Sequence, residues 1–240
     1  MSDLPSLTAI KIFADGASLP SMLESARNPR IAGFTTNPTL MRKAGVTDYR
    51  AFARQVLAEI RDRPISFEVF ADDTANMRRQ ALEIATWGDN VNVKIPVTNT
   101  RGEPSTGLIR ELAAAGVKLN VTAICTLAQV RDVAQALKGG PTSIVSVFAG
   151  RIADTGRDPI PLMREALAIC RQADARVQLL WASPRELLNI VQAAEMGCDI
   201  ITVTPDLLAK LALYGKDLAT FSLETVQMFY RDAQAAGYEL

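Results

Sequence analysis

The sequence has no histidine among its 240 residues. This absence excludes serine–histidine–aspartate and cysteine–histidine catalysis, and it also excludes a metal site with imidazole ligands. Proton transfer must therefore fall to aspartate, glutamate, lysine, tyrosine or water. The sequence implies no metal ion and no organic cofactor.

Cysteine, net charge and long apolar runs are also scarce. The three cysteines, Cys125, Cys170 and Cys198, are far apart and show no C-x-x-C spacing, which predicts a reduced, cytoplasmic protein. Lysine plus arginine equals aspartate plus glutamate at 26 each, so no overall basic field indicates nucleic acid. No run reaches about 18 apolar residues, and the N-terminal stretch lacks a signal-peptide pattern, so we expect no membrane span.

Short β-branched runs alternate with amphipathic stretches along the whole chain. The expected strands are 11–17, 32–37, 65–71, 91–97, 118–124, 143–149, 177–183 and 200–205. The clearest helical patterns are 48–63, 74–88, 127–139 and 183–197. Eight such units predict one α/β domain over residues 1–240, a single (β/α)8 TIM barrel; the alternative is an open doubly wound sheet.

The helix expected at 183–197 has an apparent N-terminal signal. Ser183, Pro184 and Glu186 fit a capping box with proline at the first helical position. Ser183 therefore has two readings, a plain helix cap or a substrate contact.

Polar residues recur near the C-terminal end of every expected strand, where barrel enzymes place their chemistry. Because side chains alternate between the two faces of a strand, these residues can converge on one opening. They are Asp15, Thr35, Asn37, Glu68, Asn92, Lys94, Asn120, Thr122, Ser146, Trp181, Ser183, Thr202 and Thr204.

Lys94 lies in the middle of an otherwise apolar strand, VNVKIPV at 91–97. One reading is a structural lysine paired with Glu68 or Asp15. The other is a nucleophile, because burial disfavours the charged ammonium and a neutral amine attacks carbonyls to form a Schiff base. The resulting iminium accepts electrons when a neighbouring C–C bond breaks, and this chemistry needs carboxylates but no metal.

Five segments taken together resemble the transaldolase family of class I aldolases, in its short bacterial branch with the fructose-6-phosphate aldolases. They are AGFTTNPTL (32–40), VNVKIPVT (91–98), LNVTAI (119–124), SVFAGRIAD (146–154) and WASPRE (181–186). The resemblance runs in order over essentially the whole chain.

The resemblance implies four catalytic residues. Lys94 matches the Schiff-base lysine, and Asp15 matches the aspartate that handles protons at substrate hydroxyls. Glu68 matches the acid that, with Thr122, holds the water relaying protons to and from the Schiff base.

The resemblance also implies a substrate-binding set for sugar phosphates. Asn37 and Asn120 match amides that hold donor hydroxyls, and Ser146 matches a serine beside the substrate. Arg151 matches the arginine that grips the phosphate, as its planar, bidentate donors allow; the alternative is a loop arginine paired with Asp154.

Three further positions have open assignments. Arg185 is a weaker phosphate candidate, Thr35 can support its turn or contact substrate, and Trp181 can be packing or a pocket wall. The N-terminal motif FADGAS departs from the common family pattern at Gly16 and Ser18. The polar stretch 98–107 is either an ordinary loop or a lid.

Two residues favour the transferase over the aldolase within this family. Transaldolases resemble this chain at Glu68, where the aldolase branch has glutamine, and at Phe148, where that branch has tyrosine. The expected reaction is therefore transfer of a dihydroxyacetone unit from fructose 6-phosphate or sedoheptulose 7-phosphate to an aldose phosphate. The alternatives are a fructose-6-phosphate aldolase that releases dihydroxyacetone and a barrel that binds sugar phosphates without turnover.

The C-terminal pattern predicts an amphipathic helix over about 222–237 that packs through Met228, Phe229 and Tyr230. In the short branch this helix contacts a neighbouring subunit, which favours a homo-oligomer.

Overall fold

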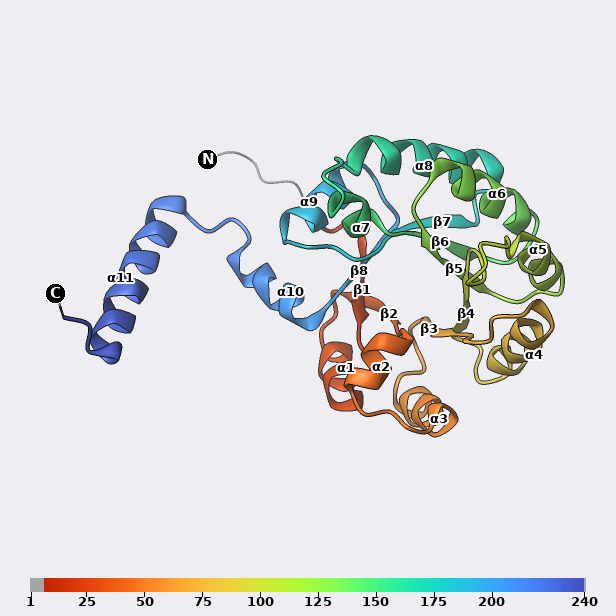
Figure 1. Ribbon diagram of the computed structural model, residues 1–240, viewed down its shortest axis with the longest axis horizontal. Coiled ribbons are helices and arrows are strands. Elements are labelled where there is room, and N and C mark those ends of the chain that lie inside the picture. The colour runs from red at the N-terminus through yellow and green to blue at the C-terminus, as the bar shows by residue number, and fades with distance from the viewer. Residues whose placement is uncertain (1–6, 240) are drawn as a thin grey trace.

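The computed structural model describes residues 7–239 and confirms the predicted (β/α)8 barrel (Figure 1). Eight parallel strands close in the order β1 to β8, and helices surround them. The strands are β1 Lys11–Asp15, β2 Ile31–Thr35, β3 Ile65–Glu68, β4 Val91–Pro96, β5 Leu119–Ile124, β6 Ser143–Val147, β7 Val177–Trp181 and β8 Ile200–Val203. The helices are α1 Leu19–Ala26, α2 Pro38–Lys43, α3 Tyr49–Glu59, α4 Thr74–Ala85, α5 Thr106–Ala114, α6 Leu127–Leu137, α7 Ala149–Ala153, α8 Ile160–Ala173, α9 Leu188–Glu195, α10 Pro205–Ala209 and α11 Leu218–Ala236, with a 3-10 turn η1 at Lys210–Leu213.

Several helices begin at a short polar residue whose side chain caps the first turn. Asp48 and Asp73 begin α3 and α4 by accepting hydrogen bonds from the backbone N–H three residues on. Thr126 begins α6 with the reciprocal capping box that it forms with Gln129.

The predicted start of the helix at 183–197 is wrong. Helix α9 begins at Leu188, and Ser183 adopts a left-handed φ of 58° in the preceding turn. A capping residue needs an extended backbone, so Ser183 cannot act as the helix cap. The cause is long-range: a Cβ on Gly150 would lie 1.5 Å from the Ser183 carbonyl oxygen, so α7 approaches this turn backbone to backbone.

Two apolar layers hold the barrel. The larger lies between the strands and the helices, and it includes Trp181, which is fully buried there. The smaller fills the barrel interior with Phe13, Ile144, Leu180, Ala182 and Ile200. The Phe13 ring occupies the space beside Gly33, where an added Cβ would come within 2.6 Å of it. This interior plug leaves the C-terminal half of the barrel to polar side chains.

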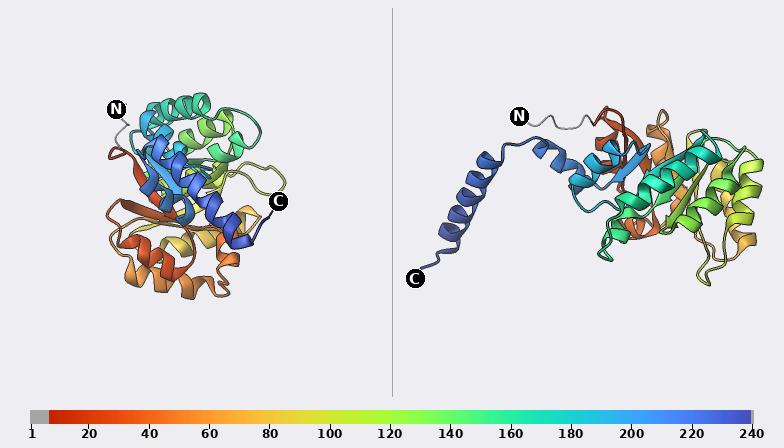
Figure 2. Two further views of the ribbon diagram at one scale, coloured as in Figure 1. Left: turned by 90° about the vertical axis from the view of Figure 1, so that its left-hand side faces the viewer. Right: turned by 90° about the horizontal axis from the view of Figure 1, so that it is seen from above.

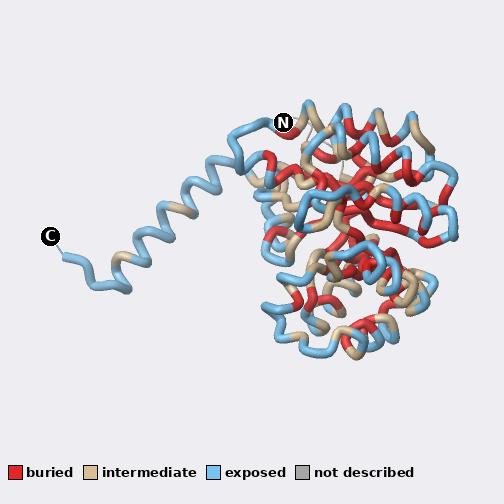
Figure 3. The backbone as a smooth tube through the Cα atoms, turned by 45° about the vertical axis from the view of Figure 1, so that its right-hand side comes forward, coloured by how far each residue is buried: buried red, intermediate tan, exposed pale blue. Residues whose placement is uncertain are grey.

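Helix α11 projects away from the barrel (Figures 1 and 2). It has no buried residue, and its tube is almost wholly exposed in Figure 3. Met228, Phe229 and Tyr230 are 42%, 62% and 66% exposed, so the expectation that they pack is not met within this chain. In residues 7–239 no helix is long and apolar enough to cross a membrane.

Candidate active site

A cavity of about 390 Å³ opens at the C-terminal end of the barrel. Of the candidate catalytic and substrate-binding residues, all except Arg185 line it, whereas Asn92, Trp181 and Thr204 of the wider polar set do not. The lining residues are Asp15, Thr35, Asn37, Pro38, Thr39, Leu40, Glu68, Lys94, Asn120, Thr122, Ala123, Ser146, Phe148, Arg151, Leu180, Ala182, Ser183 and Thr202.

Lys94 is the charged group at the floor of this cavity, with 7% of its surface exposed. Its Nζ lies 3.0 Å from Glu68 Oε2 and donates a hydrogen bond of 3.0 Å to the Thr36 carbonyl oxygen. Strand register brings Glu68, Lys94 and Asn120 into one row. Glu68 pairs with Lys94 across β3 and β4, and Lys94 pairs with Asn120 across β4 and β5. The lysine is paired, as its structural reading requires, but it also faces open space beside a second carboxylate.

That second carboxylate is Asp15, at the end of β1. Burial is the main cause that raises its pKa above the ordinary 3.8, while Lys94 and a hydrogen bond from Thr35 oppose the rise. Thr35 Oγ1 lies 2.8 Å from Asp15 Oδ1 and also hydrogen-bonds with the Thr202 hydroxyl. Thr35 therefore orients Asp15 as well as lining the cavity.

A chain of hydrogen bonds fixes the amide of Asn120. Ser146 Oγ donates to Asn120 Oδ1 at 2.6 Å, and Asn120 Nδ2 donates to Ser66 Oγ at 2.9 Å. The three side chains are buried, with Asn120 at 0% exposure. Their orientation is therefore set before any ligand binds.

Thr122 presents a buried hydroxyl with no hydrogen-bond partner in residues 7–239. The next residue, Ala123, has a left-handed φ of 64°, and the register between β5 and β6 shifts between Val121 and Ile124. Such irregularities re-aim side chains at the rims of barrels. An unpaired polar atom is costly inside a protein, so the Thr122 hydroxyl is suited to hold a water molecule or a substrate atom.

Asn37 and Tyr49 support the opposite wall. Asn37 Oδ1 caps α2 by accepting from Leu40 N at 3.0 Å, which leaves its amide N–H groups for a ligand. Tyr49 donates a 3.0 Å hydrogen bond to the backbone oxygen of Glu68, and burial raises the pKa of its hydroxyl.

The rim of the cavity is formed by the ends of β6 and β7. The guanidinium of Arg151 lies over the Phe148 ring at 5.5 Å, and no carboxylate is within ion-pair distance of it in the described part of the chain. Asp154 pairs instead with Arg185, whose Nε donates to Asp154 Oδ1 at 2.9 Å. The predicted alternative of an Arg151–Asp154 pair is therefore wrong, and Arg185 is held at the rim outside the lining of the cavity.

The inward side chains of β7 and of the residue after it are Leu180 and Ala182, whereas Trp181 faces the helix layer. The reading of Trp181 as a pocket wall is therefore wrong. The sequence pattern placed Thr202 at the opening without a role, and the structure gives it a hydrogen bond with Thr35. Sequence reasoning left two supporting groups out: the Ser66 hydroxyl and the backbone oxygen of Thr36. The polar pattern of β3 could have indicated Ser66, but no side-chain pattern signals a backbone acceptor.

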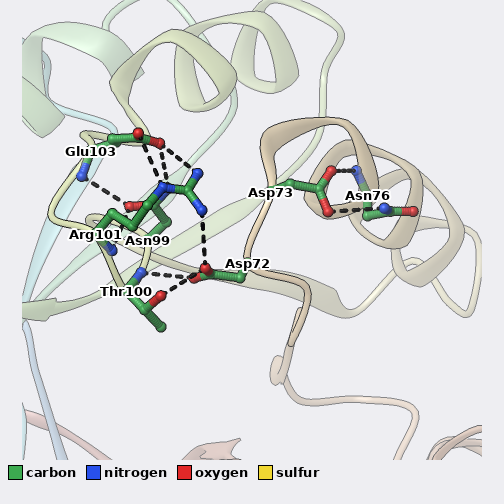
Figure 4. A network of polar contacts seen from close by, with 7 residues as sticks. All are labelled: Asp72, Asp73, Asn76, Asn99, Thr100, Arg101 and Glu103. Atoms are coloured by element: carbon green, nitrogen blue, oxygen red, sulfur yellow. Dashed lines mark hydrogen bonds and ion pairs between the residues drawn. The ribbon is translucent and has the colours of Figure 1, made fainter.

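The stretch 98–107 is tied to the neighbouring loop (Figure 4). None of its residues lines the cavity. Thr100 donates to the two oxygens of Asp72 through its N and Oγ1, at 2.7 Å each. Arg101 bonds Glu103 at the same tip, and Thr98 pairs with Pro104. These contacts favour an ordinary loop, joined to the one after β3, over a lid.

Taken together, these features define a class: a (β/α)8 barrel whose C-terminal cavity contains a buried lysine and two carboxylates. Residues 12–240 match the family described as Transaldolase/Fructose-6-phosphate aldolase. A "probable transaldolase" of Dehalococcoides mccartyi is 36% identical over 196 residues, which cover 81% of this chain and 86% of that protein. A "probable transaldolase" of Maridesulfovibrio salexigens is 33% identical and covers 90% and 97%.

Solved structures agree on the fold. A dihydrodipicolinate synthase from Rhodopseudomonas palustris superposes with a TM-score of 0.55 at 15% identity, over 83% of this chain and 71% of that one. The chain belongs to the transaldolase and fructose-6-phosphate aldolase family, which confirms the resemblance seen in its motifs. It is an enzyme of the transaldolase type.

Proposed function

We propose that this enzyme transfers a dihydroxyacetone unit from a ketose phosphate, fructose 6-phosphate or sedoheptulose 7-phosphate, to an aldose phosphate through a Schiff base on Lys94. The observation that carries the proposal is the buried Lys94 amine, 3.0 Å from Glu68 and inside a cavity that Asp15 also lines.

Schiff-base formation begins when the Lys94 nitrogen attacks the C2 carbonyl of the ketose. The ammonium must first lose a proton, and Glu68 is the carboxylate 3.0 Å away that can accept it. Loss of the C2 oxygen as water then gives the iminium. Glu68 and the unpaired Thr122 hydroxyl are suited to hold that water and to move its protons.

Cleavage follows from the iminium. The C4 hydroxyl gives its proton to Asp15, the C3–C4 bond breaks, and its electron pair forms the enamine while an aldose phosphate leaves. The raised pKa of Asp15 suits a group that takes this proton and later returns it. In transfer, the enamine attacks a second aldehyde, Asp15 protonates the new alkoxide, and hydrolysis of the iminium frees Lys94.

Amide and hydroxyl groups fix the donor sugar. The ordered Asn120 and Ser146 and the N–H groups of Asn37 are arranged for its hydroxyls. At the rim, Arg151, Ser183 and Arg185 hold the phosphate, because arginine offers paired donors to phosphate oxygens.

Phe148 favours transfer over release of dihydroxyacetone. Its phenyl ring lines the cavity and cannot donate a hydrogen bond to a water molecule near the enamine. The enamine is then hydrolysed slowly and waits for the acceptor aldehyde. The aldolase is the second candidate, because the family includes both activities.

Borohydride trapping tests the proposal. The protein is incubated with fructose 6-phosphate and reduced, and the modified peptide is mapped by mass spectrometry. A three-carbon adduct on Lys94 is expected, with loss of adduct and turnover in Lys94→Met but not in the exposed control Lys138→Met. Absence of any adduct with either ketose phosphate would favour a barrel that only binds sugars, and equal rates with and without erythrose 4-phosphate would favour the aldolase.

We also propose that the enzyme is a homo-oligomer in which α11 packs on another copy of the chain. The support is the exposure of apolar side chains along α11, among them Leu218 at 80% and Val226 at 60%. A helix with a wide apolar face is stabilised mainly by tertiary packing, and this one has none within the chain. The sequence features give no reason to propose a nucleic-acid or membrane partner.

A further inference from the structure

Asp154 has no role in the chemistry described above, yet it forms an ion pair with Arg185 at the rim of the cavity. Arg185 Nε and Nη2 each donate to a different oxygen of Asp154, so the pair is bidentate. The two residues are 31 positions apart: Asp154 directly follows α7, and Arg185 lies on the loop after β7. Their side chains are 52% and 47% exposed, so the pair contributes little to stability by itself.

Asp154 lies close to the phosphate-binding arginine along the chain. It is three residues after Arg151, and residues at this spacing share one face of a helix. The positive charge of Arg151 is among the causes that lower the pKa of Asp154, after the hydrogen bond from Arg185. The Asp154 carboxylate is therefore paired with one guanidinium, that of Arg185, and lies within electrostatic range of a second, that of Arg151.

The backbone beneath the pair is fixed from both sides. Gly150 N donates to the Ala182 carbonyl oxygen at 3.3 Å, and any Cβ on Gly150 would collide with Ser183. On the other side, Arg185 N donates to Asn189 Oδ1 at 2.8 Å. Arg185 is consequently held at its backbone and at its head group, and only the middle of its side chain is free.

The bidentate contact to Asp154 does not use all the N–H donors of Arg185. A guanidinium has five N–H donors, and the pair uses the Nε and one Nη2 hydrogen. The remaining donors can face a phosphate while Asp154 fixes the plane of the group. An arginine held in this way loses less rotamer freedom when it binds an anion.

We propose that Asp154 is a positioning residue for substrate phosphate: it holds Arg185 beside Arg151, so that the two guanidiniums and Ser183 form one preorganised anion site. This inference rests on the proposed function, since it deepens the role of the rim. It predicts that Asp154 strengthens phosphate binding, although it is itself an anion. Charge repulsion alone predicts the opposite, namely that Asp154 weakens phosphate binding.

The test compares Asp154→Asn with Asp158→Asn. Both variants remove one negative charge from the same segment, but Asp158 accepts only the Ile160 N–H, which an asparagine oxygen can still accept. Asp154→Asn should raise KM for fructose 6-phosphate about two- to fivefold, the range expected when an exposed ion pair is lost. The kcat value should be unchanged, and Asp158→Asn should match the wild type.

Arg185→Met separates positioning from a mere tie between loops. Loss of a direct phosphate contact should raise KM more than about tenfold, the effect of a hydrogen bond to a charged group. In the Arg185→Met background, Asp154→Asn should have no further effect. Equal effects of the two single variants, a further effect in the double variant, or a lower KM for Asp154→Asn would each overturn the proposal.

Calorimetry with inorganic phosphate gives a readout that needs no turnover. Phosphate should bind the wild type and Asp158→Asn equally and should bind Asp154→Asn more weakly. Weakened phosphate binding without a Lys94 adduct would mean that the site is correct and the proposed reaction is wrong. A Lys94 adduct with unchanged phosphate binding would mean that the proposed reaction is correct and the role of Asp154 is wrong.

Discussion

Replacing Thr122 with valine should separate stability from activity in this enzyme. Valine has the same shape, and the hydroxyl it removes is buried with 2% of the residue exposed and has no partner in the described chain. An unsatisfied buried hydroxyl costs about 1–3 kcal/mol, so the variant should lose no stability and should gain about 1 kcal/mol. For a chain of this size that gain corresponds to a rise in Tm of about 2–4 °C.

The activity should change in the opposite direction. If Thr122 and Glu68 hold the water that carries protons to and from the Schiff base, its loss should lower kcat about 10- to 100-fold, which is about 1.4–2.7 kcal/mol of barrier. The assay is initial-rate formation of glyceraldehyde 3-phosphate, beside thermal unfolding of the same samples. Thr122→Ser keeps the hydroxyl and should keep most of the rate.

A structural hydroxyl would behave differently, and Thr36 supplies the comparison. Its Oγ1 is also buried, but it donates a 2.9 Å hydrogen bond to the Ser66 carbonyl oxygen. Thr36→Val should therefore lose about 1 kcal/mol of stability, because it removes this hydrogen bond, while the Ser66 oxygen still accepts the Thr36 backbone N–H at 3.2 Å. A similar loss in Thr122→Val, with kcat unchanged, would refute the assignment of Thr122 to the reaction.

Three further perturbations follow from the same geometry. The raised pKa of Asp15 means that the folded protein binds its proton more tightly than the unfolded chain does, so this residue lowers stability as pH rises above 3.8. Asp15→Asn should therefore become more stable relative to the wild type as pH rises above this value, as measured by urea unfolding. A constant difference in stability at all pH values would contradict this. Phe148→Tyr should raise the ratio of free dihydroxyacetone to transfer product, because a phenol can hydrogen-bond a water molecule near the enamine; an unchanged ratio would remove Phe148 from the partition. Phe229→Glu on α11 should lower the mass found by sedimentation, whereas Gln227→Glu, 200° away around the helix, should not; equal effects would argue against α11 as the subunit contact.

The barrel and most of its site could be predicted because both depend on local periods. Alternation along β4 and β5 fixes which side chains face inward, and parallel register then brings Glu68, Lys94 and Asn120 into one row. No long-range knowledge is needed for this convergence. The same reasoning explains why the cavity contains nearly every residue that the polar pattern indicated.

Strand β7 shows where that reasoning fails. Its sequence VQLLWAS is apolar on both faces, so alternation cannot decide whether Leu180 or Trp181 faces inward. The contacts decide it: Leu180 packs in the interior plug and Trp181 in the helix layer. Ser183 then reaches the cavity through a left-handed turn that depends on Gly150. A partner 33 positions away leaves no local signal, so the turn reads as a helix cap.

The lack of histidine makes the separation of the two carboxylates the central feature of the site. Glu68 adjoins Lys94 across neighbouring strands, so in the proposed reaction it can serve the lysine nitrogen and the water that is lost or gained there. Asp15 comes from β1, which is three strands away from the Lys94 strand β4 around the closed barrel, and it accepts a hydrogen bond from Thr35. In the proposed reaction, Glu68 is engaged at the nitrogen, and Asp15 is the carboxylate that remains to serve the hydroxyls of the bound ketose. Two acids in different surroundings can thus divide the proton transfers that a single histidine often performs in other enzymes.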